Sequence, residues 1–265
     1  MIVLLKTIRS KTVVMTNFIK KIKILIFIGL VSINQAFSQN IKVAVAANLR
    51  GVIKMLAQDF NKKTGLTIEP IVGSSGNLTA QIKNGAPFDL FLSADMNFPQ
   101  TLFEAGLSTK KPVVYAKGSL IICSNRDLNF DHLESLLKSA TINKIAIANP
   151  KIAPYGKAAE ESLNKSGIFN DIKAKIVYGE SISQVNTYIT TGVAELGFTT
   201  QALIKDAGNT TKLYWKQVDP KTYAPIEQGI VLLKSAENKP DAEKFYQYIL
   251  SPAAKAIFEE YGYSK

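Results

Sequence analysis

The sequence predicts an α/β protein of two lobes, each built on a doubly wound sheet. From residue 39 onward, strand-like apolar runs alternate with amphipathic helix-like runs, which is typical of βαβ units. The alternation occurs in two similar sets. No Pro- or Ser-rich linker separates the sets, so we expect two strands to cross between the lobes, near Ala116–Gly118 and near Gln228–Gly229.

The first set of elements precedes residue 96. We expect strands at 41–47, 66–73 and 88–95, and helices at 49–65 and 77–85. In the helix at 49–65, apolar residues recur three or four positions apart until Gly65 ends the pattern. The run at 88–95 is short and almost wholly apolar, as expected for a strand inside a parallel sheet.

The second set repeats this alternation after two apolar runs at 113–124 that are joined across "AKG". We expect strands at 144–150, 173–179, 194–200 and 229–235, and helices at 155–167, 181–192 and 239–262, the last one split at Ser251-Pro252. The predicted first lobe therefore comprises residues 39–117 and 229–265, and the second lobe comprises residues 118–228.

Residues 1–38 have the layout of a cleaved secretory signal peptide. Lysines at 20, 21 and 23 precede an apolar stretch at 24–33, and the small-residue site Ala36-Phe37-Ser38 follows. The apolar stretch is short for a membrane span, although an uncleaved N-terminal anchor is the alternative. Met15 is a plausible true start. We expect export to the periplasm.

Composition excludes several classes of function. The net charge is +11, and the six basic residues of 1–38, which contains no acid, leave +5 spread among acids in the rest of the chain. No nucleic-acid partner is expected from so dispersed a charge. With one cysteine, Cys123, and one histidine, His132, the chain has no material for an internal disulfide, a zinc site or a Cys–His nucleophile. Cys123 lies in the apolar run "SLIICS" and is expected in the core.

Four strand-to-helix junctions carry small or donor-rich residues. They are Ala46–Leu49, Ser74–Asn77, Ala153–Gly156 and Glu180–Gln184. A helix N-terminus presents unpaired N–H groups and the positive end of the helix dipole. Each junction alone is explained by ordinary capping. Four of them at the carboxyl ends of strands, where binding crevices form in α/β sheets, indicate an anion site.

The junctions are nearly free of charge. None contains an arginine, and Lys157 lies one residue inside its helix. Neutral donors suit a fully ionised tetrahedral oxyanion, which only accepts hydrogen bonds, whereas a protonated phosphate also needs an acceptor. Glu180 is the one candidate acceptor, unless it caps its own helix.

Five stretches after residue 38 are distinctive: "VAVAANL", "GSSGNLTAQIKNGAPFDLFLSAD", "IANPKIAPYGKAAEESL", "AELGF" and "SPAAKAIFEEYGY". They resemble the periplasmic molybdate-binding proteins of molybdate ABC transporters, and the resemblance covers essentially the whole chain after residue 38. It implies a type II periplasmic binding-protein fold that holds molybdate or tungstate between two lobes and delivers it to an inner-membrane permease.

The resemblance also implies a set of ligand-binding residues. They are Asn48, Ser74, Ser75, Gly76, Tyr155, Ile182 and Thr200. Tyr155 and Ile182 would contribute main-chain N–H groups. Some relatives place a tyrosine after "LGIV", whereas this chain has "LGFTT", so that Thr199 or Thr200 stands there.

Other functions remain as alternatives. A receptor for sulfate, thiosulfate or phosphate would use the same fold, and a sensor or adaptor would signal instead of transporting. Catalysis is not expected: "GSSGN" lacks the last glycine of a nucleophile elbow, "GNLTAQIKNG" is not a P-loop, and His132 lies outside all four junctions. We expect no cofactor, no direct metal-ion ligands, a monomer, and hinge closure around the ligand.

Overall fold

The computed structural model describes residues 40–207 and 211–264. The predicted signal peptide at 1–38, its alternative as an anchor, and Met15 lie outside the described residues. Within the described part, no helix has both the length and the apolar character needed to cross a membrane.

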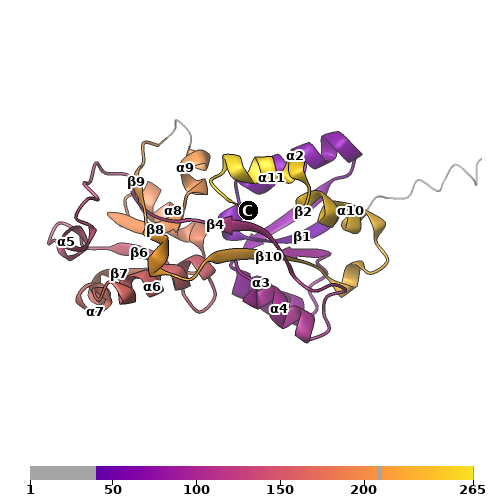
Figure 1. The fold of residues 1–265 in the computed structure, drawn as a ribbon, viewed down its shortest axis with the longest axis horizontal. Coiled ribbons are helices and arrows are strands. Elements are labelled where there is room, and N and C mark those ends of the chain that lie inside the picture. The colour runs from indigo at the N-terminus through magenta and orange to yellow at the C-terminus, as the bar shows by residue number, and fades with distance from the viewer. Residues whose placement is uncertain (1–39, 208–210, 265) are drawn as a thin grey trace, which may run out of the picture. The chain divides into compact units, whose positions relative to one another are not determined.

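The first lobe is built on a five-stranded sheet with the order β2-β1-β3-β10-β4. Its strands are β1 (Ile41–Ala46), β2 (Ile68–Gly73), β3 (Leu90–Leu92), β4 (Val113–Gly118) and β10 (Ile226–Leu232). Its helices are α2 (Val52–Thr64), α3 (Ser75–Lys83), α4 (Asn97–Glu104), α10 (Pro240–Ile249) and α11 (Pro252–Glu260), with short 3-10 turns η1 (Ala47–Leu49) and η4 (Lys234–Ala236). Helices α2, α10 and α11 cover one face of this sheet, and α3 and α4 cover the other (Figure 1).

The second lobe repeats the arrangement with the order β7-β6-β8-β5-β9. Its strands are β5 (Leu120–Ser124), β6 (Ile145–Ala148), β7 (Ile176–Gly179), β8 (Leu196–Thr200) and β9 (Tyr214–Gln217). Its helices are α5 (Leu133–Lys138), α6 (Pro154–Lys165), α7 (Phe169–Ile172), α8 (Ile182–Thr190) and α9 (Ala202–Ala207), with 3-10 turns η2 (Lys173–Lys175) and η3 (Pro220–Thr222).

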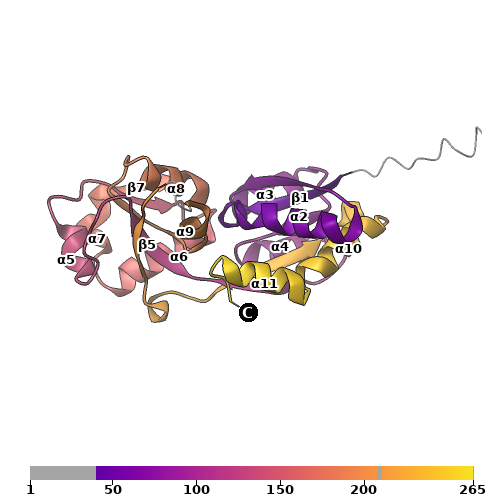
Figure 2. The same cartoon turned by 90° about the horizontal axis from the view of Figure 1, so that it is seen from above.

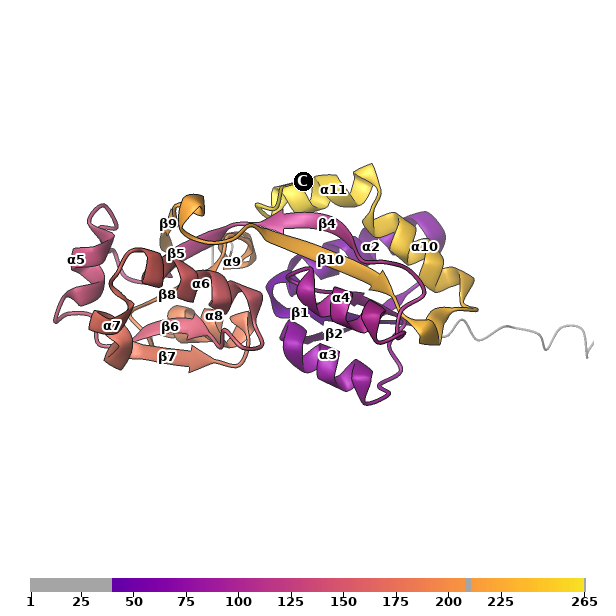
Figure 3. The ribbon, with the colours of Figure 1, turned by 60° about the horizontal axis from the view of Figure 1, so that its bottom comes forward.

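One strand in each sheet runs against the others, and it is the strand that arrives from the other lobe. β10 is antiparallel to β3 and β4, and β5 is antiparallel to β8 and β9. The two crossing segments, β4 to β5 and β9 to β10, run side by side, as Figure 3 shows. Pairing of β4 with β10 shifts register between Gln228 and Gly229. The prediction that strands themselves cross near Ala116–Gly118 and Gln228–Gly229 agrees with this path.

The C-terminal segment contacts one of the strands that connect the two lobes. Helix α11 lies beside β4 (Figure 3), and the C-terminal end of the chain lies next to α11 (Figure 2). Beyond it, Lys117 and Ser264 exchange backbone hydrogen bonds of 2.7 and 2.9 Å. The end of the chain therefore supports the region through which the two lobes are connected.

Each lobe has its own core, as the apolar runs predict. Strands β1 and β3 are buried on both faces, because helices cover both sides of the sheet. In the first lobe, Phe60 packs edge-on against Phe245 with ring centroids 5.0 Å apart. In the second, Cys123 is fully buried within β5, and burial raises the pKa of its thiol to about 12. Cys123 is thus a core residue, as expected.

Candidate ligand-binding site

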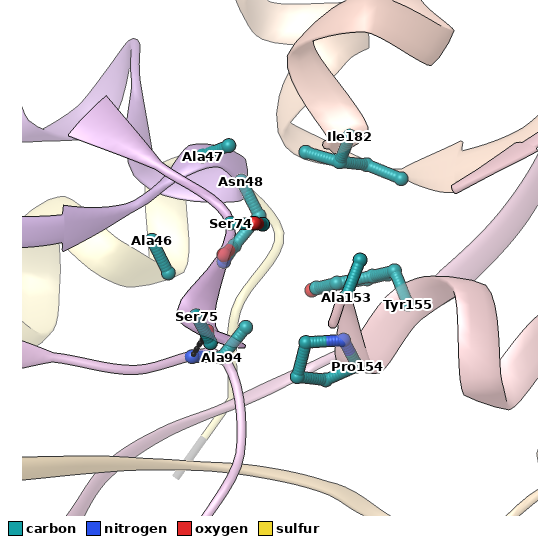
Figure 4. Close-up of a pocket in the computed structure, with 10 residues that line it drawn as sticks. All are labelled: Ala46, Ala47, Asn48, Ser74, Ser75, Ala94, Ala153, Pro154, Tyr155 and Ile182. Atoms are coloured by element: carbon teal, nitrogen blue, oxygen red, sulfur yellow. Dashed lines mark hydrogen bonds between the residues drawn. The ribbon is translucent and has the colours of Figure 1, made fainter. Parts of the chain in front are cut away.

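A small cavity lies where the two lobes face each other. All four predicted strand-to-helix junctions contribute to its wall (Figure 4). The lining residues are Ala46, Ala47, Asn48, Ser74, Ser75 and Ala94 from the first lobe, and Ala153, Pro154, Tyr155 and Ile182 from the second. The small lining side chains suit a compact solute.

Ser74 precedes α3 in the extended conformation of a cap residue, yet its side chain makes no capping hydrogen bond. Its Oγ is buried and has no partner among the described residues. A buried hydroxyl without a partner costs about 1–3 kcal/mol. Capping therefore does not explain Ser74, and its hydroxyl is free to bind a solute.

Ser75 is the first residue of α3. Its Oγ accepts a hydrogen bond from the backbone N–H of Ala94 at 3.0 Å. The oxygen is thereby held in place while its own proton remains available. At the start of α3, backbone N–H groups also lack intrahelical acceptors. This junction therefore combines two hydroxyls with the positive end of a helix dipole.

Asn48 lies in the 3-10 turn η1 and is buried. Its Nδ2 donates to Gln228 Oε1 at 3.0 Å and to the Tyr263 hydroxyl at 3.1 Å. The Tyr263 hydroxyl in turn donates to the Asn48 carbonyl at 2.8 Å. Residues 180 and 215 positions away in the sequence thus hold Asn48 in the cavity wall.

Tyr155 and Ile182 supply the opposite wall from the first turns of two helices. Pro154 and Tyr155 are the first two residues of α6, and Ile182 is the first residue of α8. Neither helix has a side-chain cap. The N–H groups of Tyr155 and Ile182 therefore have no acceptor within their helices and are available to a solute.

The cavity wall is electrically neutral. Its ten residues include no carboxylate, lysine or arginine. Glu180 does not line the cavity but a polar groove that shares Ala47 and Asn48 with it, and Lys157 points toward Glu161 at 3.8 Å. Burial raises the pKa of the Tyr155 hydroxyl well above its ordinary value, so that it stays protonated. The wall offers a fully ionised oxyanion neutral donors and no buried ion pair.

Hydrogen bonds join the lobes around the cavity. The Gly76 N–H donates to the Ile152 carbonyl at 2.9 Å. On the other side, Arg50 Nε donates to Ser183 Oγ at 2.9 Å, and that hydroxyl donates to the Ala47 carbonyl at 3.3 Å. These contacts form only where the facing edges of the two lobes lie close together.

Comparison with known proteins identifies the family. The family model described as bacterial extracellular solute-binding protein matches residues 41–264. The chain belongs to this family. Its resemblance to periplasmic molybdate-binding proteins is also confirmed. It is 36% identical over 229 residues to the molybdate-binding protein ModA of Azotobacter vinelandii, covering 86% of this chain and 91% of the relative. It is 37% identical over 223 residues to ModA of Rhodobacter capsulatus, covering 83% and 86%.

The solved structure of the Azotobacter vinelandii periplasmic molybdate-binding protein superposes with a TM-score of 0.80 at 34% identity. The match covers 85% of this chain and 99% of that one. The two-lobed fold predicted from the sequence is thus confirmed. Proteins of this kind are solute-binding components of transport systems.

The cavity brings together five of the seven residues expected to bind the ligand. Asn48, Ser74, Ser75, Tyr155 and Ile182 line it. The other two lie elsewhere in this structure. The N–H of Gly76 bonds to the opposite lobe. Thr200, buried at the end of β8, accepts from the Ala202 N–H at 3.3 Å and lies within reach of the Tyr155 and Tyr263 hydroxyls behind the wall.

Sequence reasoning missed the polar groups behind the wall of the cavity. They are Gln228, Tyr115 and Tyr263, all of which are buried. The Tyr115 hydroxyl donates to Gln228, and Asn48 bonds to both Gln228 and Tyr263. For Gln228 alone the sequence contains a weak indication, because this polar residue directly precedes the apolar run "GIVLL" at a predicted crossing between the lobes. His132 lies at the start of α5, away from the cavity, as predicted.

Proposed function

We propose that this solute-binding protein captures molybdate in the cavity between its lobes and delivers it to an ABC permease. The observation that carries the proposal is the buried, unpartnered hydroxyl of Ser74 at the start of α3, in a wall without a carboxylate. A dianion that only accepts hydrogen bonds satisfies such donors. The names of the two ModA relatives support molybdate as the ligand.

Within this proposal, five residues hold the ligand. Ser74 and Ser75 donate through their hydroxyls, Tyr155 and Ile182 through their backbone N–H groups, and Asn48 through its carboxamide. Gly76 and Thr200 act indirectly: Gly76 closes the gap between the lobes, and Thr200 supports the wall from behind.

Hinge closure follows from the position of the cavity. A ligand bonded to both walls has a higher affinity for the closed arrangement and therefore shifts the population toward it. The bending region is the pair of crossing segments, with lobes at residues 39–117 plus 229–265 and at 118–228. The closed protein then docks on the permease through the rims of both lobes.

The proposal extends to related properties of the protein. Tungstate has the same shape and charge as molybdate and is expected to bind as well. The protein acts as an exported periplasmic monomer without enzymatic activity. Sulfate and phosphate receptors are the alternative, and the neutral wall disfavours protonated phosphate because no carboxylate accepts its proton.

Isothermal titration of the purified protein with molybdate, tungstate, sulfate and phosphate in turn tests the proposal. One-to-one binding of molybdate and tungstate alone is the expected result. Tight binding of sulfate or phosphate instead would mean that the protein is an oxyanion receptor for a ligand other than molybdate. No heat with any of the four anions would refute an oxyanion receptor.

A further inference from the structure

A buried polar network connects the cavity to β10, one of the two strands at the lobe crossing. Gln228 of β10 is fully buried. Its Oε1 accepts from Asn48 Nδ2 at 3.0 Å and from the Tyr115 hydroxyl at 2.8 Å. Its Nε2 donates to the Tyr155 hydroxyl at 3.3 Å. One carboxamide therefore contacts cavity residues of both lobes, Asn48 and Tyr155.

In this arrangement Asn48 has the wrong polarity for an oxyanion. Both hydrogens of its Nδ2 are directed at Gln228 and Tyr263. Its Oδ1 is buried without a partner among the described residues. A carbonyl oxygen only accepts hydrogen bonds, and so do the oxygens of a fully ionised oxyanion. The two would repel each other.

Half a turn of both carboxamides removes this conflict. It exchanges nitrogen and oxygen in each side chain, and such terminal torsions are broad and nearly two-fold. The Gln228 nitrogen then donates to the Asn48 oxygen and to the Tyr115 hydroxyl oxygen. The Tyr115 hydroxyl continues to donate its own proton to the Ser93 carbonyl, 2.9 Å away. The Gln228 oxygen accepts from the Tyr155 hydroxyl. The Tyr263 hydroxyl alone loses its hydrogen bond from Asn48 Nδ2, because its own proton is donated to the Asn48 carbonyl. Asn48 Nδ2 becomes free for the cavity.

We propose that Gln228 is a positioning residue that sets the polarity of Asn48, and that the two carboxamides turn over together when an oxyanion enters. The inference rests on the proposed function. The turned arrangement gives up one hydrogen bond, that of Asn48 with Tyr263, and a hydrogen bond from Asn48 Nδ2 to the oxyanion replaces it. The ligand interacts favourably with only one of the two arrangements and thereby selects it.

A double-mutant cycle with molybdate tests the inference. Gln228→Met removes both polar atoms and keeps a side chain of similar length. An ionised glutamate in Gln228→Glu can only accept hydrogen bonds and therefore keeps Asn48 Oδ1 toward the cavity. Both are made in the unaltered protein and in Asn48→Ala. Gln247→Met, on the exposed face of α10, is the matched control and is expected to bind molybdate normally.

The expected result is a coupled loss of affinity. Gln228→Met weakens molybdate binding roughly tenfold, and this loss disappears in the Asn48→Ala background. Gln228→Glu weakens it further, and the part that persists with Asn48→Ala measures charge repulsion. Equal losses from Gln228→Met in both backgrounds would mean a merely structural role and overturn the inference. Failure of the unaltered protein to bind molybdate would instead overturn the proposed function and this inference with it.

A measurement on the unaltered protein covers the case in which a variant does not fold. Nuclear Overhauser contacts between the Asn48 side-chain amide protons and the Tyr263 ring are expected in the free protein. Saturation with molybdate should abolish them, while new contacts form between the Gln228 amide protons and the Tyr115 ring. If the contacts of the free protein persist in the molybdate complex, the proposal that the two carboxamides turn over is refuted.

Discussion

Replacing Ser74 with alanine separates a ligand-binding role from a capping role, because the two predict opposite effects on stability. Ser74 Oγ is buried and makes no hydrogen bond to the described residues. Its removal therefore relieves a desolvation penalty and should raise the free energy of unfolding by about 1 kcal/mol. A hydrogen bond to a charged ligand is worth about 1.5–3 kcal/mol, so molybdate affinity should fall roughly 10- to 150-fold. If Ser74 were a helix cap, its replacement would instead lower the free energy of unfolding by about 0.5–2 kcal/mol and leave molybdate affinity unchanged.

The assay is chemical denaturation without ligand, combined with isothermal titration of molybdate. Ser251→Ala is the matched control, because Ser251 caps α11 by accepting from the Ala254 N–H at 3.3 Å. It should lower stability by about 1 kcal/mol and leave affinity intact. If Ser74→Ala behaves like Ser251→Ala, the reasoning about the cavity is refuted.

Three further predictions concern closure, packing and pH. Gly76→Ala places a Cβ 2.9 Å from the Cα of Ile152 in the other lobe, so closure should cost about 1–3 kcal/mol more. Titration should show weaker molybdate binding, and scattering a more open complex. Phe60→Ala, in the first core, should lower the free energy of unfolding by about 3–5 kcal/mol, measured by denaturation. The Lys110 side chain lowers the pKa of Glu243, so this carboxylate stabilises the fold above its unfolded pKa of about 4.3 and loses that effect as the pH falls through the lower, folded pKa. Glu243→Gln should therefore cost at most about 1 kcal/mol at neutral pH and nothing in strong acid; a difference that grows as the pH falls would contradict this sign.

Local patterns were sufficient for most elements and for the position of the cavity. The strand and helix runs that form β1, α2, β3 and α8 follow from apolar periodicity, which reflects burial on one or both faces. Elements with weak patterns were missed. Strand β9 (Tyr214–Gln217) is largely exposed at the edge of its sheet, so it has no apolar alternation. Helix α4 and the short helices α7 and α9 were not predicted either.

The sequence by itself determined which residues could donate to an anion, because small side chains, hydroxyls and helix starts are local properties. It did not determine which donors are used elsewhere. Tertiary contacts direct the N–H of Gly76 to Ile152, leave the hydroxyl of Ser74 unpaired, and place Gln228 against Asn48, 180 residues away. Local chemistry determines which donors and acceptors a segment has. Only packing between distant segments decides which donors, such as the Ser74 hydroxyl, remain unpaired and therefore available to a ligand.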